Sequence, residues 1–234
     1  MTTPLALRDV AFRWPGTGAG GAGFALSVPA FAMTRGESAL LLGDSGSGKS
    51  TLLSLICGIV QPQRGEVELD GEILSALSAA RRDRLRGERI GVIFQQFNLL
   101  PWASVEDNIL LALQFAPERR RRTPDAPAEA ARLCAALGLP KGIGATPAGR
   151  LSTGQQQRVA AARALIGAPP LIVADEPTSA LDASAQGAFL DLLFDQCRAA
   201  GSTLLMVSHD ARIAPRFDRA VNLADIATAE RSAA

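Results

Sequence analysis

A glycine-rich loop between an apolar run and a helix-forming run is the feature that most constrains the fold of this chain. Residues 43–50 read GDSGSGKS, which fits the pattern G-x-x-x-x-G-K-[ST]. The run ALLL precedes this loop and TLLSLICGI follows it. A strand that leads through such a loop into a helix predicts an α/β fold. The alternative is a glycine-rich turn that precedes a helix and binds nothing.

The composition of this loop, the P-loop, suits phosphate binding. Gly43, Gly46 and Gly48 permit backbone conformations that are closed to other residues. Consecutive N–H groups can then point at phosphate oxygens, and the helix that begins near Lys49 adds the positive end of its dipole. The Lys49 ammonium would neutralise the outer phosphates, and the Ser50 hydroxyl can ligate Mg²⁺. The loop therefore indicates a nucleoside triphosphate but does not specify the reaction.

Apolar and amphipathic runs elsewhere extend the α/β pattern. Strands are predicted at 5–12, 24–31, 38–43, 65–70, 90–94, 171–175, 203–208 and 219–223, and helices at 49–59, 155–167 and 183–200. Residues 16–23, GTGAGGAG, predict a flexible connector. Residues 103–150 contain helical runs at 104–115 and 127–137 and no good strand, so we expect a helical insertion there. The arginine run at 118–122 predicts a solvated loop, with contact to anionic lipid headgroups as the alternative.

The bulk properties exclude several classes of protein. The chain has 234 residues and a net charge of +1, so no basic field favours nucleic acid. Its three cysteines form no CxxC pair, which argues against a metal site or a disulfide framework and favours a reduced, cytosolic compartment. No leader-like segment and no apolar run of roughly 18 residues is present. We expect a soluble chain that can still dock on a membrane protein.

Two carboxylates follow the apolar run 171–175 directly. The segment LIVADEPTSALD places Asp175 and Glu176 at the expected end of a strand, where open α/β sheets bind ligands. Asp175 can hold Mg²⁺ through water. Glu176, turned to the other side by the alternation of a strand, suits a general base for an attacking water. The alternative is a solvated acidic turn.

The only histidine of the chain, His209, follows the run 203–208. If the strands are parallel, their carboxyl ends meet at one edge of the sheet, and His209 would lie near Glu176. There it could bridge the γ-phosphate and the catalytic carboxylate. The alternative is a histidine without a role in the site.

A polar segment, LSTGQQQR at 151–158, precedes the helical run VAAARALIG. Ser152 and Gln155 have the spacing of a capping box. This segment could serve only to start a helix, or its helix end could also hold a ligand.

The segments GDSGSGKST, LSTGQQQR, LIVADEP and SALD, followed by His209, together resemble the ABC-type ATPases in their order along the chain. The resemblance spans nearly the whole chain and implies one domain over residues 1–234. It implies a P-loop NTPase (RecA-like) core with a mainly parallel sheet and an antiparallel β subdomain, formed by 1–94 and 168–234. Residues 95–167 would form the Q-loop, the helical subdomain and the signature helix.

The resemblance also implies which residues form the site. Catalytic roles would fall to Lys49, Gln95, Glu176 and His209, and Mg²⁺ ligation to Ser50, Gln95 and Asp175. ATP contacts within one copy would come from the P-loop residues Gly43, Asp44, Ser45, Gly46, Ser47, Gly48, Lys49, Ser50 and Thr51 and from Trp14. Ser152, Gly154, Gln155 and Asp182 would contact the ATP or the chain of a second copy.

Some positions leave alternatives open. Gln96 is the alternative to Gln95 as the Q-loop glutamine. Trp14 is expected to stack on adenine, where the family often has tyrosine, or else to be an ordinary surface residue; Phe12 is expected in the core. The family usually has glycine at position 153, and threonine disfavours positive φ. Either the backbone at Thr153 is helical, or the signature site is weakened.

The function that the resemblance implies is ATP hydrolysis by a head-to-tail homodimer with two ATP molecules at its interface. Separate transmembrane permease subunits would place the chain at the cytoplasmic face of the inner membrane, without nucleic acid. Residues 97–113 would contact the permease through Phe97, Leu99, Leu100 and Trp102, unless these side chains form the core of the insertion.

The segment from GEILSALSAARRDRLRGERIGVIFQQFNLLP to VEDNI looks most like the lipoprotein-releasing and macrolide-exporter branch. That similarity implies export or lipoprotein extraction. The alternative is an ABC ATPase of the cell-division type, which transmits force and moves no substrate. ABC ATPases of DNA repair or the ribosome do not fit a chain of this length. A P-loop kinase or GTPase would need neither LSTGQ nor His209.

Overall fold

A computed structural model describes residues 3–15, 23–179 and 181–231 of the chain. The chain forms two compact units, one of residues 1–86 with 207–234 and one of residues 87–206. The expected connector at 16–23 lies almost wholly outside the described residues. The division into core residues 1–94 and 168–234 and insertion residues 95–167 stays a prediction.

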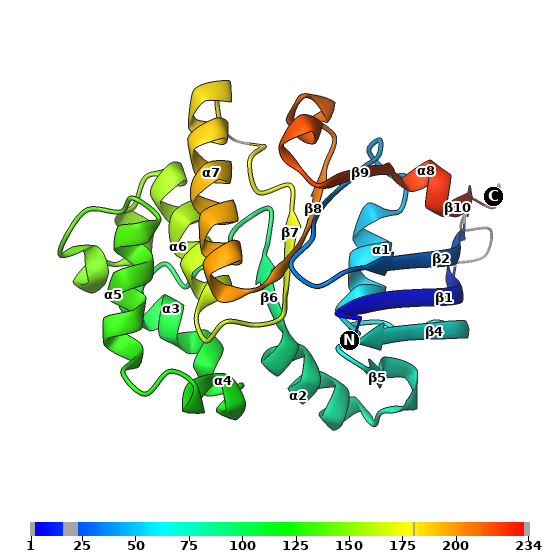
Figure 1. Cartoon of the computed structure of the whole chain (residues 1–234), viewed down its shortest axis with the longest axis horizontal. Helices are drawn as coiled ribbons and strands as arrows, with labels where there is room; N and C mark the ends of the chain where they lie inside the picture. Colours follow the sequence, from blue (N-terminus) through cyan, green and yellow to red (C-terminus); the bar gives the residue numbers. More distant parts are fainter. Residues whose placement is uncertain (1–2, 16–22, 180, 232–234) are drawn as a thin grey trace. The chain divides into compact units, whose positions relative to one another are not determined.

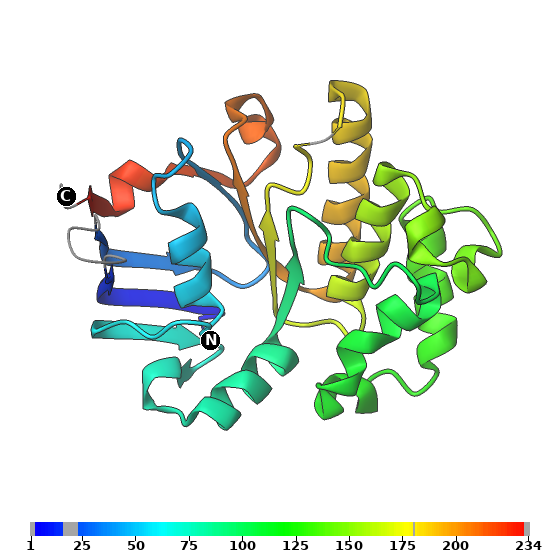
Figure 2. The same ribbon diagram turned by 180° about the vertical axis from the view of Figure 1, so that it is seen from behind.

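The first unit contains an antiparallel sheet of five strands. Their order is β10 (Thr228–Arg231), β2 (Phe24–Met33), β1 (Leu5–Trp14), β4 (Arg64–Leu69) and β5 (Glu72–Ile73). In the middle of the sheet, Leu7 lies opposite Phe31 on one side and Val67 on the other, and all three are buried. The predicted antiparallel β subdomain is thus present. Figure 2 shows α1 (Lys49–Ile56) running beside this sheet.

The first unit also holds a parallel strand pair and short helices. β3 (Ser38–Leu42) pairs in parallel with β9 (Arg219–Asn222). The remaining elements are η1 (Leu74–Ala76), most of α2 (Ala79–Arg89), η4 (Ala211–Arg216) and α8 (Leu223–Ile226). Helix α2 was not predicted, because AARRDRLRGER is strongly polar. Within it, Leu85 and Glu88 are buried.

The second unit surrounds another parallel pair with helices. β6 (Ile90–Ile93) pairs with β7 (Leu171–Asp175), and β8 (Thr203–Ser208) runs across the boundary to the first unit. The helices are α3 (Val105–Gln114), α4 (Pro117–Arg121), α5 (Ala126–Ala136), α6 (Thr153–Leu165) and α7 (Ala183–Ala200), with η2 (Ile143–Ala145) and η3 (Ala148–Arg150) between α5 and α6. Figure 1 shows α3, α5 and α6 gathered on one side of this unit. Residues 103–150, which were predicted to form a helical insertion, are therefore mainly helical in the structure.

Close packing of α6 on β6 depends on one glycine. A Cβ added to Gly91 would lie 2.1 Å from the carbonyl oxygen of Ala164, a distance that is too short for any real Cβ atom. Gly91 therefore lets the backbone of α6 approach β6 directly. The alanine-rich face of α6, with Ala160, Ala161 and Ala164 buried, fits the same close approach.

The arginine run corrects an expectation. Its residues form α4, and Arg119 is only 2% exposed. Its guanidinium donates to the carbonyl oxygens of Ala164, Ile166 and Gly87, so it satisfies the carboxyl end of α6. Burial lowers the pKa of Arg119 to about 10, which leaves it charged at neutral pH. The solvated-loop prediction was wrong because it treated the run as uniform, whereas Arg120 and Arg121 are exposed and Arg119 is not.

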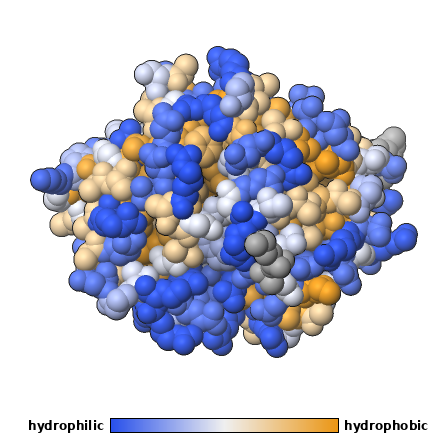
Figure 3. Space-filling view, in the orientation of Figure 1, coloured by the Kyte–Doolittle hydropathy of each residue, from blue (hydrophilic) through white to orange (hydrophobic). Residues whose placement is uncertain are grey.

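The face in Figure 3 is covered mostly by hydrophilic residues, with hydrophobic ones in small patches between them. The large hydrophobic side chains that are exposed include Trp14, Phe94, Trp102 and Phe115. Among the described residues, no helix combines the length and the apolarity that crossing a bilayer requires.

Candidate active site

The P-loop joins β3 to α1 in the first unit. Gly46 and Gly48 have φ values of 76° and 107°, in the region that favours glycine. Gly48 is the N-cap of α1, and no described side chain caps this helix end. The first turn of α1 thus presents its N–H groups as an anion site.

Lys49 and Ser47 line the same loop. Lys49 Nζ donates to the carbonyl oxygens of Gly43 at 2.6 Å and Asp44 at 2.9 Å, which holds the ammonium at the loop. Ser47 Oγ is buried and has no hydrogen-bond partner among the described residues. Buried hydroxyls are normally satisfied, so this one is suited to a ligand oxygen. A Cβ on Gly43 would come within 2.8 Å of it, which explains the glycine there.

Trp14 lies beside the first turn of α1. Its Nε1 donates to Thr51 Oγ1 at 3.2 Å, and its ring meets the ring of Phe12 edge-on, with centroids 4.9 Å apart. Phe12 is buried, as predicted, whereas Trp14 is 41% exposed. The stacking of this exposed indole on adenine stays a prediction.

The two carboxylates lie in the second unit, at the end of β7. The strand ends at Asp175, and Glu176 has a φ of 43°. Because the strand conformation stops one residue earlier, strand alternation does not extend to Glu176, and the predicted direction of its side chain stays a prediction. A left-handed conformation costs a non-glycine residue about 1–2 kcal/mol and often marks a functional site.

The Q-loop, residues 95–98, follows β6 in the same unit. Gln95 and Gln96 are both exposed, so the structure leaves both assignments open. Phe97 and Asn98 have φ values of 59° and 50°, two consecutive left-handed residues that are not glycine. Arg163 of α6 donates to both of their carbonyl oxygens.

The signature segment, residues 151–158, starts α6 with the predicted capping box. Ser152 Oγ accepts from the Gln155 N–H at 3.4 Å, and Gln155 Oε1 accepts from the Ser152 N–H at 3.0 Å. Thr153 is the first residue of the helix and has no positive φ, so threonine fits there without strain. A Cβ on Gly154 would meet nothing within 4 Å. The helix end is therefore both capped and open to close approach.

Asp182 caps the next helix. Its Oδ1 accepts from the Ala185 N–H at 2.8 Å at the start of α7. Its predicted contact with a second copy stays a prediction. Ala180, in the SALD segment, lies outside the described residues.

His209 is exposed and follows β8 in the first unit, whereas Asp175 and Glu176 belong to the second. The expected meeting of His209 with Glu176 stays a prediction. Within the described residues, no group of three His, Cys, Asp or Glu side chains forms a metal site.

Comparison with known proteins identifies the family. The sequence matches the family described as "ABC transporter" over residues 26–179, more than half of the chain. The chain belongs to the ABC transporter family. As an ABC ATPase it hydrolyses ATP to ADP and phosphate and serves as the ATP-binding subunit of a transporter, which confirms the resemblance seen in the sequence.

Two named relatives are similar in sequence to this ABC ATPase over most of its length. The lipoprotein-releasing system ATP-binding protein LolD of Shewanella denitrificans is 40% identical over 191 residues, 82% of this chain and 80% of that protein. The macrolide export ATP-binding/permease protein MacB of Hyphomonas neptunium is 38% identical over 230 residues, 96% of this chain but only 34% of that protein.

The fold of the ABC ATPase is shared with a solved structure. The dimeric structure of MJ0796, titled a bacterial ABC transporter cassette, has a TM-score of 0.78 and 30% identity and covers 93% of each chain. A second structure of MJ0796, titled a post-hydrolysis state bound to ADP and Pi, has a TM-score of 0.74 and 32% identity. These matches confirm the predicted P-loop NTPase fold.

Sequence reasoning missed two residues of the site. Gln157 and Arg163 lie on α6 and hydrogen-bond to Pro177 and to the Q-loop. Their signal was a polar side chain on a helix in which several alanine residues are buried. The carbonyl oxygens that they reach could not be found from the sequence, because every residue carries one.

Proposed function

We propose that two copies of the chain pair head to tail around two ATP molecules and drive a conformational change in separate permease subunits. The observation that carries this proposal is the open helix end at Gly154. A capped helix N-terminus with no Cβ in the way can approach a phosphate closely. Among the described residues of its own copy, a Cβ added at Gly154 would meet no atom within 4 Å outside its own helix backbone, which suits a ligand held by the other copy. The dimeric structure of MJ0796 supports the pairing.

In each copy the P-loop would hold the phosphates. The N–H groups of 43–50 surround them, and Lys49 neutralises charge that develops on the transferred phosphoryl group. The buried hydroxyl of Ser47 would gain the partner that it lacks among the described residues. Trp14, beside Thr51, would stack on adenine.

Glu176 would accept the proton of the attacking water. A positioned general base contributes about 10²–10⁴-fold to the rate. His209 would contact the γ-phosphate and hold this carboxylate in place. Asp175 and Gln95 would order the water and the metal.

The candidate metal ligands fit Mg²⁺, because hydroxyl, amide and carboxylate oxygens are the donors that this ion prefers. Ser50, Gln95 and Asp175 would hold it, directly or through water. When bound, Mg²⁺ supplies positive charge that stabilises the phosphates during transfer.

In the second copy, Ser152, Gly154 and Gln155 would contact the γ-phosphate. Ser152 Oγ accepts the Gln155 N–H, so its own proton can be donated to a phosphate oxygen. Asp182, which already orders the start of α7, would contact the facing P-loop.

The permease contact would lie in the second unit. Phe97 is buried, which favours for this residue the alternative that it packs in the core. Leu99 and Leu100 are half-buried, and Trp102 is 77% exposed, so the contact would centre on these three side chains.

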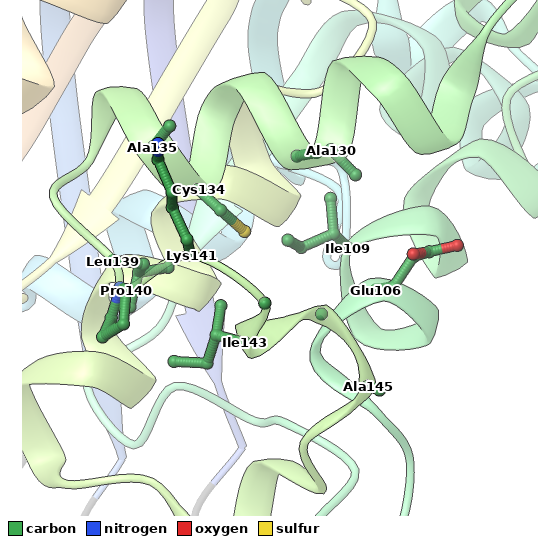
Figure 4. Close-up of a pocket in the computed structure, with 13 residues that line it drawn as sticks. Glu106, Ile109, Ala130, Cys134, Ala135, Leu139, Pro140, Lys141, Ile143 and Ala145 are labelled. Carbon is green, nitrogen blue, oxygen red and sulfur yellow. The ribbon is translucent and has the colours of Figure 1, made fainter.

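An apolar pocket of about 390 Å³ lies between α3, α5 and residues 139–145. Figure 4 shows Ile109, Cys134 and Ile143 around it and Glu106 at one side. Helix α3 thus contributes both to the segment 97–113 and to a recess that a short helix of a permease could enter. The chain would in this way lie at the cytoplasmic face of the membrane.

The substrate class follows from the relatives. LolD is named for lipoprotein release and MacB for macrolide export, so we propose export or lipoprotein extraction. MacB carries an ATP-binding part and a permease in one protein, and this chain corresponds to a third of it. Separate permease subunits would supply the rest. The second candidate, a force-transmitting complex of the cell-division type, would use the same ATPase without a substrate.

Glu176→Gln tests the catalytic proposal. This variant should bind ATP and remain dimeric with ATP. Its rate of ATP hydrolysis should fall by about 10²-fold or more. Normal turnover would remove Glu176 from the role.

Crosslinking tests the head-to-tail dimer in the Glu176→Gln background, with Cys57, Cys134 and Cys197 replaced by alanine. There, Ser47→Cys and Ser152→Cys should crosslink between copies only with ATP. A crosslink that never forms would contradict the head-to-tail dimer.

A further inference from the structure

Two polar side chains of α6 reach loops that carry proposed catalytic residues. Gln157, which is 1% exposed, donates from Nε2 to the carbonyl oxygen of Pro177 at 2.8 Å. Arg163 donates to the carbonyl oxygens of Phe97 at 2.5 Å and Asn98 at 2.7 Å. All five residues belong to the second unit, so these contacts lie within one compact body.

Both loops are conformationally strained where α6 holds them. Pro177 follows Glu176, whose φ is 43°, and the Q-loop carries φ values of 59° and 50° at Phe97 and Asn98. A left-handed backbone is unfavourable for residues other than glycine. Such conformations persist only where neighbouring groups determine them. The hydrogen bonds from α6 are restraints of that kind.

The helix that supplies these restraints is itself well anchored. Its first turn is fixed by the capping box, and its carboxyl end packs on β6 through Gly91 and is held by Arg119. Gln157 and Arg163 are six positions apart, roughly 9 Å along the axis. One rigid element therefore connects the Gly154 end with both loops.

We infer that Gln157 and Arg163 are positioning residues, through which α6 fixes Glu176 and Gln95 for hydrolysis. In each copy, the N-terminus of α6 would bind the ATP that is held by the other copy. The same helix thereby sets the geometry for hydrolysis in its own copy. This inference rests on the proposed function, since it takes the roles of Glu176 and Gln95 from it. It adds a link between the two ATP sites that runs through a single helix.

Kinetics of the dimer at saturating ATP test the inference. Arg163→Gln removes the two bonds to the Q-loop, and Gln157→Met removes the bond to Pro177 at similar side-chain size. Because misplacement by about 1 Å can cost about 10²-fold, kcat should fall about tenfold or more in each variant. ATP is proposed to bind mainly in the first unit, so KM should stay within about twofold.

Arg132→Gln is the control. Arg132 lies on α5 in the same unit, is exposed, and donates to Glu129 and Gln196, neither of which has a proposed role in the site. It should leave kcat and KM unchanged. Arg163→Lys keeps the positive charge and one donor nitrogen. Its kcat should therefore lie between that of Arg163→Gln and that of the unmodified chain.

Each outcome decides the inference. A folded Arg163→Gln variant with the kcat of the unmodified chain would overturn it, as would an equal loss in Arg132→Gln. If Arg163→Gln does not fold, Arg163→Lys decides: a reduced kcat at unchanged KM supports the inference, and an unchanged kcat overturns it. Absence of ATP hydrolysis by the unmodified chain would instead contradict the proposed function.

Discussion

The backbone N–H of Ser152 donates to Gln155 Oε1 while Ser152 Oγ accepts from the Gln155 N–H, so each residue caps the other at the start of α6. This reciprocal bond fixes the helix end without covering Gly154. The segment thus does both things that its sequence allowed: it caps a helix, and it leaves a backbone surface open to a ligand.

The first prediction separates these two roles with Gly154→Ala. Gly154 lies in the helix without positive φ, and an added Cβ meets nothing. Alanine should therefore stabilise the chain by about 0.5–1 kcal/mol in urea unfolding. The same methyl group would stand where the phosphate is proposed to approach, so ATPase activity should fall about tenfold or more.

Ser152→Ala is the comparison, since it should lower both activity and stability, the latter by about 1 kcal/mol. Full activity in Gly154→Ala would show that no ligand approaches there.

The second prediction concerns the arginine run. Arg119→Met leaves carbonyl oxygens at the carboxyl end of α6 without their donor, and should lower the free energy of unfolding by about 2–4 kcal/mol. Arg120→Met, at the exposed neighbour, should change it by less than about 0.5 kcal/mol. Urea titrations of the two variants side by side measure the difference. Equal effects would mean that the burial of Arg119 contributes no stability.

The third prediction uses the pH dependence of two cysteines. Burial raises the pKa of Cys134 from 9.0 to about 11, with Glu106 adding to the shift, and burial raises the pKa of Cys197 to about 12. Above pH 9 the unfolded chain loses these protons before the folded chain does. The free energy of unfolding should therefore be fully retained below this pH and fall as the pH rises toward 11.

Urea titrations across this range should show a shallower fall in a variant with both cysteines replaced by alanine. As a second readout, iodoacetamide should modify the folded chain slowly near pH 8 and the urea-unfolded chain rapidly, because the thiolate is the reactive form. Rapid modification of both thiols in the folded chain would contradict their burial.

The fourth prediction addresses adenine. Trp14 and Trp102 are the only tryptophans, so Trp102→Phe leaves Trp14 as the single fluorophore. ATP should quench its emission if the base stacks on the indole. Trp14→Ala should weaken ATP binding about tenfold, the cost of losing one stacked base, whereas Trp102→Phe should not change it. Unchanged emission together with unchanged affinity in Trp14→Ala would place adenine elsewhere.

Much of the fold could be predicted from local sequence signals. Apolar runs predicted the strands at 171–175 and 203–208 and the helix at 183–200 with the bounds observed, because each is bounded by residues that end or cap it. The capping box at Ser152 needed only a spacing of three residues. Helix α2 and the secondary structure and burial of the arginine run could not be predicted, because these polar segments show no periodic pattern of hydrophobic residues.

The sequence by itself determined the chemistry of the site: the P-loop, the two carboxylates, the lone histidine and the signature segment. Only the tertiary structure decided which polar side chains are restraints. Arg163 reaches Asn98 across 65 residues of chain, and Arg119 reaches Ile166 across 47. Both bond to backbone carbonyl oxygens, which every residue carries. No residue type marks such an acceptor in advance, so the partner is fixed only when packing brings the backbone within reach.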